Sequence, residues 1–181
     1  DDVYNKVVLN GTIEINFPKN ISSGLILKSN TDVQINGEII VNPNSFSHYR
    51  VFYLEGVSNV NIDGGVIVGD VESHIGNEGE FGMGISIVSS KYVSISNTKI
   101  IKMWGDGIYI GRMNYESPTD VVKSENITIR NTSCNLNRRQ GISLTCCSKV
   151  HIDGCTFYGT GTIKYAMPGY GIDIEPNNQY D

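Results

Sequence analysis

The sequence predicts an all-β fold, a single-stranded parallel β-helix of about five to six coils with three short strands in each coil. Two repeating patterns predict it. The first is a strand-like segment, clearest at residues 104–111 (Trp-Gly-Asp-Gly-Ile-Tyr-Ile-Gly), in which apolar residues alternate with other residues. The second is another strand-like segment that follows at a nearly constant distance. A strand unit that returns every two to three dozen residues is typical of a stacked solenoid.

The first strand of each coil is marked by an apolar residue that would point inward. These residues are Leu25, Phe52, Ile85, Ile108, Ile142 and Ile172, separated by 27, 33, 23, 34 and 30 residues. In a β-helix each strand pairs with its equivalents in the coils above and below, about 4.8 Å away. The pattern therefore predicts that these six residues form one ladder inside the solenoid.

The second and third strands of each coil follow from the same comparison. Inward residues of the second strand are predicted to be Val33, Val60, Val93, Ile127 and Val150, and those of the third strand Ile40, Ile67, Ile100, Cys134 and Phe157. A turn rich in Asn and Gly separates the two strands, and we expect Asn97 to stack on Asn131 there, because Asn tolerates a left-handed backbone. One coil is longer by eleven residues, which places an insertion at about residues 112–123.

Composition fits one domain that covers residues 1–181. The net charge is −5 and no basic run is present, which argues against nucleic acid as the main partner. No apolar run approaches the length of a membrane span, and the N-terminus lacks the charged and apolar regions of a signal peptide. The last first-strand copy ends six residues before Asp181 and would leave an apolar coil face uncovered. We therefore expect the chain to be a fragment of a longer protein.

No cofactor is predicted. The four cysteines (Cys134, Cys146, Cys147 and Cys155) form no Cys-x-x-Cys pair and lie far from the histidines, so we interpret them as small buried thiols rather than zinc ligands. Residues 70–82 carry several acidic side chains that could hold calcium or form a wall of a groove. They lack the spacing of a calcium-binding loop, and a solvated loop is the preferred interpretation.

Three segments resemble a known group of proteins. Residues 138–143 (Arg-Arg-Gln-Gly-Ile-Ser), 171–177 (Gly-Ile-Asp-Ile-Glu-Pro-Asn) and, less specifically, 105–107 (Gly-Asp-Gly) are similar to phage tail-spike and pre-neck-appendage proteins of the pectin-lyase-like superfamily. The resemblance implies a right-handed β-helix, a homotrimer, an extracellular or virion-associated location and a bacterial polysaccharide as partner. The chain lacks the Gly-His-Gly signature of polygalacturonases, so that activity is not implied.

Stacking the coils gathers polar residues on one outer face. Carboxylates can supply the acid and the base or nucleophile of glycoside cleavage, while an aromatic ring, arginines and amides can bind sugar. The predicted catalytic residues are Asp106, Asp173 and Glu175. The predicted substrate-binding residues are Trp104, Tyr109, Arg138, Arg139, Gln140 and Ser143. The expected function is a glycoside hydrolase or polysaccharide lyase, with the choice left open.

Each candidate also has a structural interpretation. Asp106 could belong only to a turn, and Asp173 with Glu175 could be solvated residues that pair with the arginines. Trp104 could pack beneath the insertion instead of binding sugar. The alternative function is accordingly a non-catalytic glycan-binding or structural shaft module of a phage appendage or adhesin. A scaffold for protein partners is a third, weaker alternative.

Overall fold

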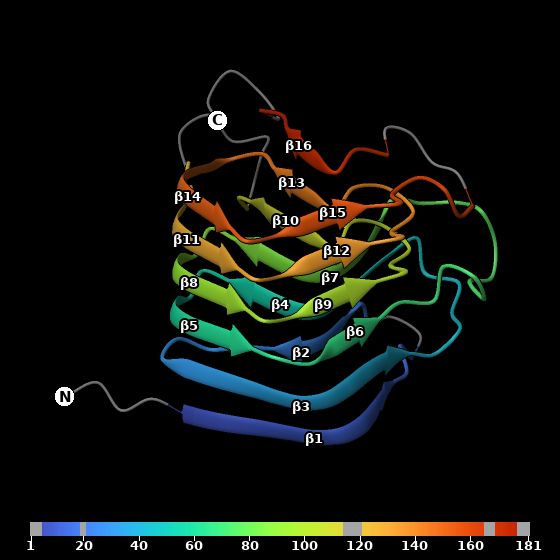
Figure 1. The fold of residues 1–181 in the computed structure, drawn as a ribbon, viewed down its shortest axis with the longest axis horizontal. Coiled ribbons are helices and arrows are strands. Elements are labelled where there is room, and N and C mark those ends of the chain that lie inside the picture. Colours follow the sequence, from blue (N-terminus) through green and yellow to red (C-terminus); the bar gives the residue numbers. More distant parts are fainter. Residues whose placement is uncertain (1–4, 19–20, 114–120, 165–168, 177–181) are drawn as a thin grey trace.

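The computed structural model describes residues 5–18, 21–113, 121–164 and 169–176. Within these ranges the chain forms sixteen strands and no helix, and every strand pair is parallel. Figure 1 shows the strands stacked in coils from β1 at the blue end to β16 at the red end. The predicted all-β parallel β-helix is thus confirmed.

The first strand of every coil belongs to a six-stranded sheet. Its members are β2 (Ser23–Ile26), β4 (His48–Glu55), β7 (Phe81–Val88), β10 (Ile108–Gly111), β13 (Ile142–Leu144) and β16 (Ile172–Ile174). The register pairs Leu25 with Phe52 and continues through the four isoleucines in the predicted order. The predicted inward ladder of this sheet is therefore confirmed at all six positions.

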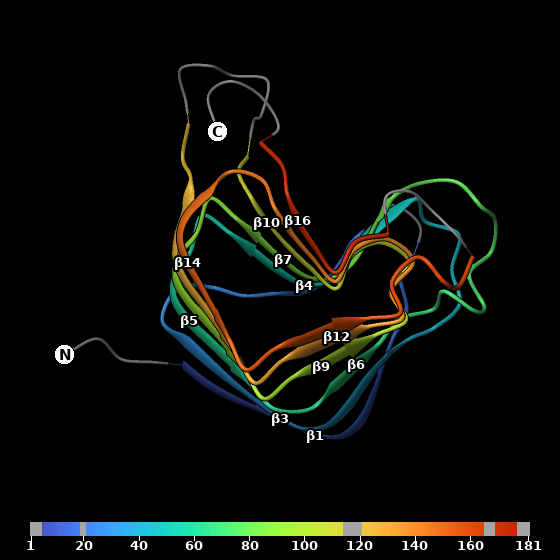
Figure 2. The ribbon, with the colours of Figure 1, turned by 45° about the horizontal axis from the view of Figure 1, so that its top comes forward.

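The second and third strands form one ten-stranded sheet that bends. The second strands are β5 (Ser58–Asp63), β8 (Lys91–Ser96), β11 (Ser124–Arg130) and β14 (Cys147–Asp153), and the third strands are β6 (Val66–Val68), β9 (Lys99–Ile101), β12 (Ser133–Asn135) and β15 (Thr156–Tyr158). They are joined in one sheet because β1 (Asn5–Ile15) and β3 (Thr31–Val41) run through the bend without a break. Figure 2 shows the resulting three-sided cross-section.

The predicted register is wrong in the coil of β3. Val33 pairs with Ile62 rather than Val60, and the buried third-strand residue is Ile39 instead of Ile40. The first error is a slip of two residues, which keeps the same side chains inward and so leaves the hydrophobic pattern unchanged. The second arises because β3 has one more residue at its bend than the strands above it.

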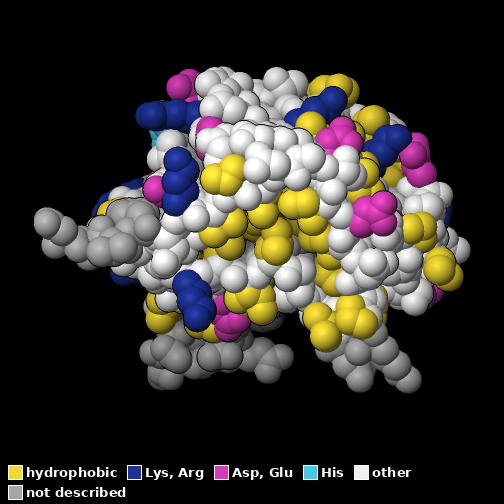
Figure 3. Space-filling view, turned by 90° about the horizontal axis from the view of Figure 1, so that it is seen from below, with side chains coloured by type: hydrophobic (Ala, Val, Ile, Leu, Met, Phe, Trp, Pro, Cys, Tyr) yellow, Lys and Arg dark blue, Asp and Glu magenta, His cyan; other side chains and the backbone are white. Residues whose placement is uncertain are grey.

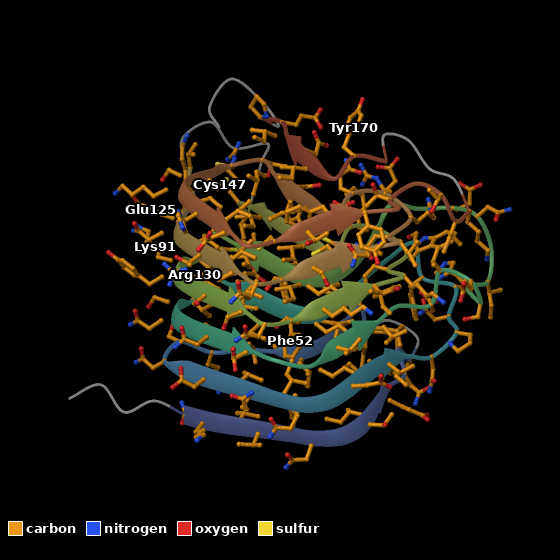
Figure 4. All side chains as sticks on the ribbon, in the orientation of Figure 1. Phe52, Lys91, Glu125, Arg130, Cys147 and Tyr170 are labelled. Carbon is orange, nitrogen blue, oxygen red and sulfur yellow. The ribbon has the colours of Figure 1, made fainter. Side chains whose placement is uncertain are left out.

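The interior contains ladders of aliphatic side chains, with Phe52 at the centre in Figure 4. In the same view Lys91 and Glu125 point outward from β8 and β11, where they form a surface ion pair at 3.7 Å. None of the four cysteines forms a disulfide, and Cys134 and Cys146 are buried, in line with the interpretation of these residues as small buried thiols. Asn131 donates to Asn97 across 3.4 Å, and both residues have positive φ, which confirms the expected stack.

Apolar side chains are exposed at both ends of the described stack. Figure 3, a view from the side of β1, shows hydrophobic atoms across the middle of that face, and Val7 and Val8 on β1 are exposed. At the other end Ile174 on β16 is 77% exposed although it continues the inward ladder. The expectation of an uncovered apolar face holds for the part of the chain that the structure describes.

Connecting segments gather at the corner between the third strands and the six-stranded sheet (Figure 2). The segments that leave β9, β12 and β15 each end at a glycine just before the next strand of the six-stranded sheet, at Gly107, Gly141 and Gly171. Successive glycines approach one another closely, and an added Cβ at Gly107 would lie 2.6 Å from the carbonyl oxygen of Gly141. The corner thus depends on small residues, and it positions the polar residues beside them.

We predict that Gly107→Ala lowers the free energy of unfolding by about 1–3 kcal/mol, because the new methyl group would also meet Asn137 and Cys134 at 2.7 Å. Gly171→Ala is the matched control. It occupies the same position two coils away, where the nearest atoms are 3.4 and 3.5 Å from the added Cβ. Urea denaturation of both variants measures the difference. Equal stability of the two would contradict this account of the corner.

Candidate functional site

A groove lies on the outer face of the six-stranded sheet. It has a volume of about 250 Å³ and is lined by Glu80, Phe81, Asp106, Tyr109, Arg139, Gln140, Ser143, Thr145, Asp173 and Glu175. The register places Tyr109, Ser143 and Asp173 in one outward ladder across β10, β13 and β16. All three predicted carboxylates and four of the six predicted binding residues therefore meet in one place.

Asp106 lies on the floor of the groove and is only 2% exposed. Its Oδ2 accepts a hydrogen bond from the Ser143 hydroxyl at 2.8 Å, and its Oδ1 accepts one from the backbone N–H of Gln140 at 3.2 Å. Burial raises the pKa of the Asp106 carboxyl above its usual value of 3.8, against the lowering effect of Arg139 and the two hydrogen bonds. The Asp106 carboxyl therefore keeps its proton to a higher pH than a free aspartic acid does.

Gln140 joins Asp106 to Asp173. Its backbone binds Asp106, while its side-chain Nε2 donates to Asp173 Oδ2 at 2.6 Å. Asp173 in turn raises the pKa of Asp106 slightly through charge repulsion, the smallest of the resolved causes. One residue thus holds two carboxyl groups of the groove in a fixed relation. Glu175 is exposed and lines the same groove two residues further along the chain.

A wall of the groove comes from Glu80 and Phe81, which lie in the segment 70–82 that was considered as a possible wall although a solvated loop was the preferred interpretation. Arg139 donates to the backbone oxygen of Glu80, and its Nη1 lies 3.4 Å from Glu80 Oε2. The same guanidinium is 6.0 Å from the ring of Phe81, which is 47% exposed. The exposed aromatic ring of the groove is therefore Phe81. Phe81 was not among the predicted substrate-binding residues, because its sequence context gives no signal for that role.

The hydroxyl of Tyr109 lies 3.2 Å from that of Thr145, across β10 and the end of β13. An added Cβ on Gly111 would sit 2.5 Å from the Tyr109 hydroxyl, so the Tyr109 side chain lies over this glycine. Thr145 was not among the predicted substrate-binding residues. Tyr109 and Thr145 together give the groove a second hydroxyl-bearing surface.

The structure does not bring Trp104 and Arg138 into the groove. Trp104 is 1% exposed, stacks on His74 with ring centroids 3.7 Å apart, and has the Arg138 guanidinium 3.8 Å from its ring centroid. Arg138 is also buried, and both of its terminal nitrogens donate to the backbone oxygen of Gly79, at 3.1 and 2.6 Å. These two residues instead fix the loop that carries Glu80 and Phe81.

A buried polar cluster holds the start of this loop. Asp70 accepts hydrogen bonds from the Tyr49 hydroxyl at 2.6 Å, from Asn44 Nδ2 at 2.9 Å and from His74 Nδ1 at 2.8 Å. Burial lowers the pKa of His74, more than Asp70 raises it. Within the described ranges no three His, Cys, Asp or Glu side chains are grouped so that they could hold a metal ion. The Asp70 carboxylate accepts its hydrogen bonds from donors of the protein itself.

Comparison with known families matches the architecture. A family model described as a right handed beta helix region matches residues 9–179. The chain belongs to the right-handed β-helix family. Among the described residues of this β-helix, no helix is long and apolar enough to span a membrane.

Two relatives and one solved structure are similar to this β-helix. Uncharacterized protein YclG of Bacillus subtilis is 33% identical over 168 residues, and the SPbeta prophage-derived uncharacterized protein YorA of the same organism is 32% identical over 167 residues. The matches cover 88% and 86% of this chain but 29% and 28% of the relatives, so the β-helix spans less than a third of their length. The prophage origin of YorA fits the resemblance to phage proteins.

The A-module of the mannuronan C-5 epimerase AlgE4 of Azotobacter vinelandii has the same fold, with a TM-score of 0.69. The two chains are 16% identical, and the match covers 94% of this chain and 45% of that chain. At this identity the likeness concerns the fold alone.

Proposed function

We propose that the groove binds a bacterial surface or acidic polysaccharide and processes it by acid–base chemistry. The observation that carries the proposal is the pair of carboxyl groups, Asp106 and Asp173, linked through Gln140 in an open groove. One of them is buried with a raised pKa, and the other lies beside it in the groove. Carboxyl groups in two different environments are the usual means of providing an acid and a base in one site.

The groove also offers unused hydrogen-bonding atoms. Nε of Arg139 and Oε1 of Gln140 are buried and have no hydrogen-bond partner among the described residues. A sugar hydroxyl can donate to Oε1, and a hydroxyl or uronate carboxylate can accept from Nε–H. The exposed ring of Phe81 adds an apolar surface for a pyranose ring. Arg139, Gln140, Tyr109 and Ser143 are thus the proposed sugar-binding residues, and Phe81 joins them.

In a hydrolase, Asp106 would give its proton to the glycosidic oxygen as the bond to the anomeric carbon breaks. Asp173 or Glu175 would take a proton from the attacking water, so that a new reducing end forms. In a lyase, the base would remove the proton next to the uronate carboxylate. The glycosidic oxygen would then leave with a proton from the acid, producing an unsaturated uronate. Arg139 would offset the carboxylate charge in this second route.

The deciding experiment incubates the protein with a panel of bacterial capsular polysaccharides and exopolysaccharides, recording reducing ends and the absorbance of unsaturated uronates together. Because the fold neighbour is a mannuronan C-5 epimerase, mannuronan is included in the panel, and deuterium uptake at C5 is followed in D2O. Reducing ends alone would indicate a hydrolase, and both signals a lyase. Deuterium uptake without cleavage would indicate epimerisation. The absence of all three signals would contradict an enzymatic role.

A non-catalytic glycan-binding or shaft module is the second candidate. It is favoured by the deep burial of Asp106, whose two oxygens already accept hydrogen bonds from the protein. Its prediction is saturable binding of a polysaccharide without any product. An extracellular or virion-associated location and a homotrimer belong to this proposal as well. Sedimentation of the purified protein would test the trimer.

A further inference from the structure

A second pocket lies beside the corner loops and shares no lining residue with the groove. It has a volume of about 250 Å³ and is lined by Asn77, Trp104, Arg138 and Lys164. The four residues come from four different corner segments, so the pocket forms only when these segments come together. Its lining consists of two cations, one amide and one indole.

Neither cation of the pocket forms an ion pair with a carboxylate of the described residues, although the charge of Glu80 acts on Arg138 from a greater distance. Among the described residues Arg138 donates to the backbone oxygen of Gly79 alone, and Lys164 Nζ donates to the backbone oxygen of His74 at 2.8 Å. No carboxylate oxygen of the described residues lies within ion-pair distance of either one. Lys164 Nζ is 5.6 Å from the Trp104 ring centroid, so both positive charges lie close to the indole. The pocket therefore has the charge that favours an anion.

Two donors at the pocket are buried and unused. The indole Nε1–H of Trp104 and the Nε–H of Arg138 have no acceptor among the described residues, although Trp104 is 1% and Arg138 5% exposed. Buried N–H groups without an acceptor are rare, because losing their hydrogen bonds to water costs free energy. An oxyanion in the pocket would supply both acceptors, while Lys164 still has two ammonium hydrogens to donate.

We propose that the pocket formed by Asn77, Trp104, Arg138 and Lys164 binds a carboxylate. A carboxylate has two oxygens with about four lone-pair sites, which suit the two orphan N–H groups and the lysine. Its single negative charge offsets part of the charge of Arg138 and Lys164. The volume suits a small organic acid or one uronate residue of a larger chain. The site is independent of the chemistry proposed for the groove, and it can bind its ligand whether or not the groove is catalytic.

The test uses the fluorescence of Trp104, which is the only tryptophan of the chain. Wild-type protein is titrated with acetate and with glucuronate, with KCl as the ionic-strength control and glucose as the neutral control. We expect a saturable change of Trp104 emission with both carboxylates and none with KCl or glucose. If oligouronates bind more tightly than glucuronate, the carboxylate comes from a polysaccharide. If the two bind equally, the ligand is a free small acid.

Lys164→Met removes the charge but keeps most of the side-chain length, and it should weaken carboxylate binding roughly tenfold or more. Lys99→Met, which alters an exposed lysine on β9 outside the pocket, should bind like wild type. Because Lys164→Met could perturb Trp104 directly, the carboxylate-dependent rise in Tm is measured in parallel. The proposal is overturned if wild type shows neither signal beyond KCl, if Lys164→Met binds as tightly as wild type, or if phosphate or sulfate binds more tightly than the carboxylates.

Discussion

Asp106→Asn is expected to reduce polysaccharide processing by at least ~10²-fold, because the amide cannot transfer a proton as the acid does. The fold should be retained. Asparagine has the same shape, its oxygen can accept from the Gln140 N–H, and its amide can donate to the Ser143 hydroxyl. Wild-type and variant turnover are compared on whichever polysaccharide responds in the panel. Turnover equal to wild type would remove Asp106 from the catalytic residues.

The same variant has a stability signature that depends on pH. Because burial raises the pKa of Asp106, the folded protein binds more protons at this site than the unfolded chain between the two pKa values. The wild type therefore loses stability as pH rises from the usual value of 3.8 through the raised value, whereas Asp106→Asn does not. At pH 7 the variant should melt at the same temperature or higher, and below pH 3.8 its relative advantage should vanish.

Glu55→Gln is the matched control for Asp106→Asn. Glu55 is an exposed carboxylate at the end of β4 on the same sheet and lies outside the groove lining. Both its activity and its pH profile of stability should follow the wild type. A loss of activity in Glu55→Gln would mean that general surface charge, and not the buried acid, governs the reaction.

Asp70→Ala is expected to lower the free energy of unfolding by about 3–5 kcal/mol. The change removes the shared acceptor of Tyr49, Asn44 and His74, and leaves their donors buried without partners. Urea denaturation followed by Trp104 fluorescence measures the loss, and it also reports locally because His74 stacks on Trp104. A loss below about 1 kcal/mol would mean that the cluster contributes little beyond its packing.

Glu72→Ala is the control within the same loop. Glu72 forms an exposed pair with Lys102 at 2.7 Å, and exposed pairs contribute about 0–1 kcal/mol. The difference in stability loss between Asp70→Ala and Glu72→Ala shows how much more the buried carboxylate contributes than the exposed one. We also expect Asp70→Ala to weaken carboxylate binding at the second pocket, because that variant loosens the support beneath Trp104.

The fold was predictable because the apolar alternation survives in every coil. The six inward positions from Leu25 to Ile172 could be aligned directly, since each lies in a short strand next to glycine or a similar marker. The register of Val33 could not be predicted, because a slip of two residues leaves the inward and outward faces unchanged. Only the packing of β3 between its neighbours determines which register forms.

The candidate site was predictable where its residues lie on strands and not where they lie at the corner. Ser143 and Asp173 follow from the ladder, since side chains of a strand alternate strictly between its two faces. Trp104 and Arg138 lie two residues before Asp106 and Gln140, in turning segments where that alternation no longer holds. Their burial depends on a distant loop, since His74 lies 30 residues before Trp104 and Gly79 lies 59 residues before Arg138, a relation that only the folded structure provides.

Every described strand pairs in parallel with strands of other coils, and this arrangement also affects how the protein folds. Ile85 and Ile108 are 23 residues apart and Ile108 and Ile142 are 34 apart, so no ladder can close within a single coil. Such a topology has a high contact order and few local contacts that could nucleate folding quickly. The costly step is docking the first two coils, after which each further coil adds to an existing template. Assembly of this solenoid is therefore expected to be slow to start and sequential once started.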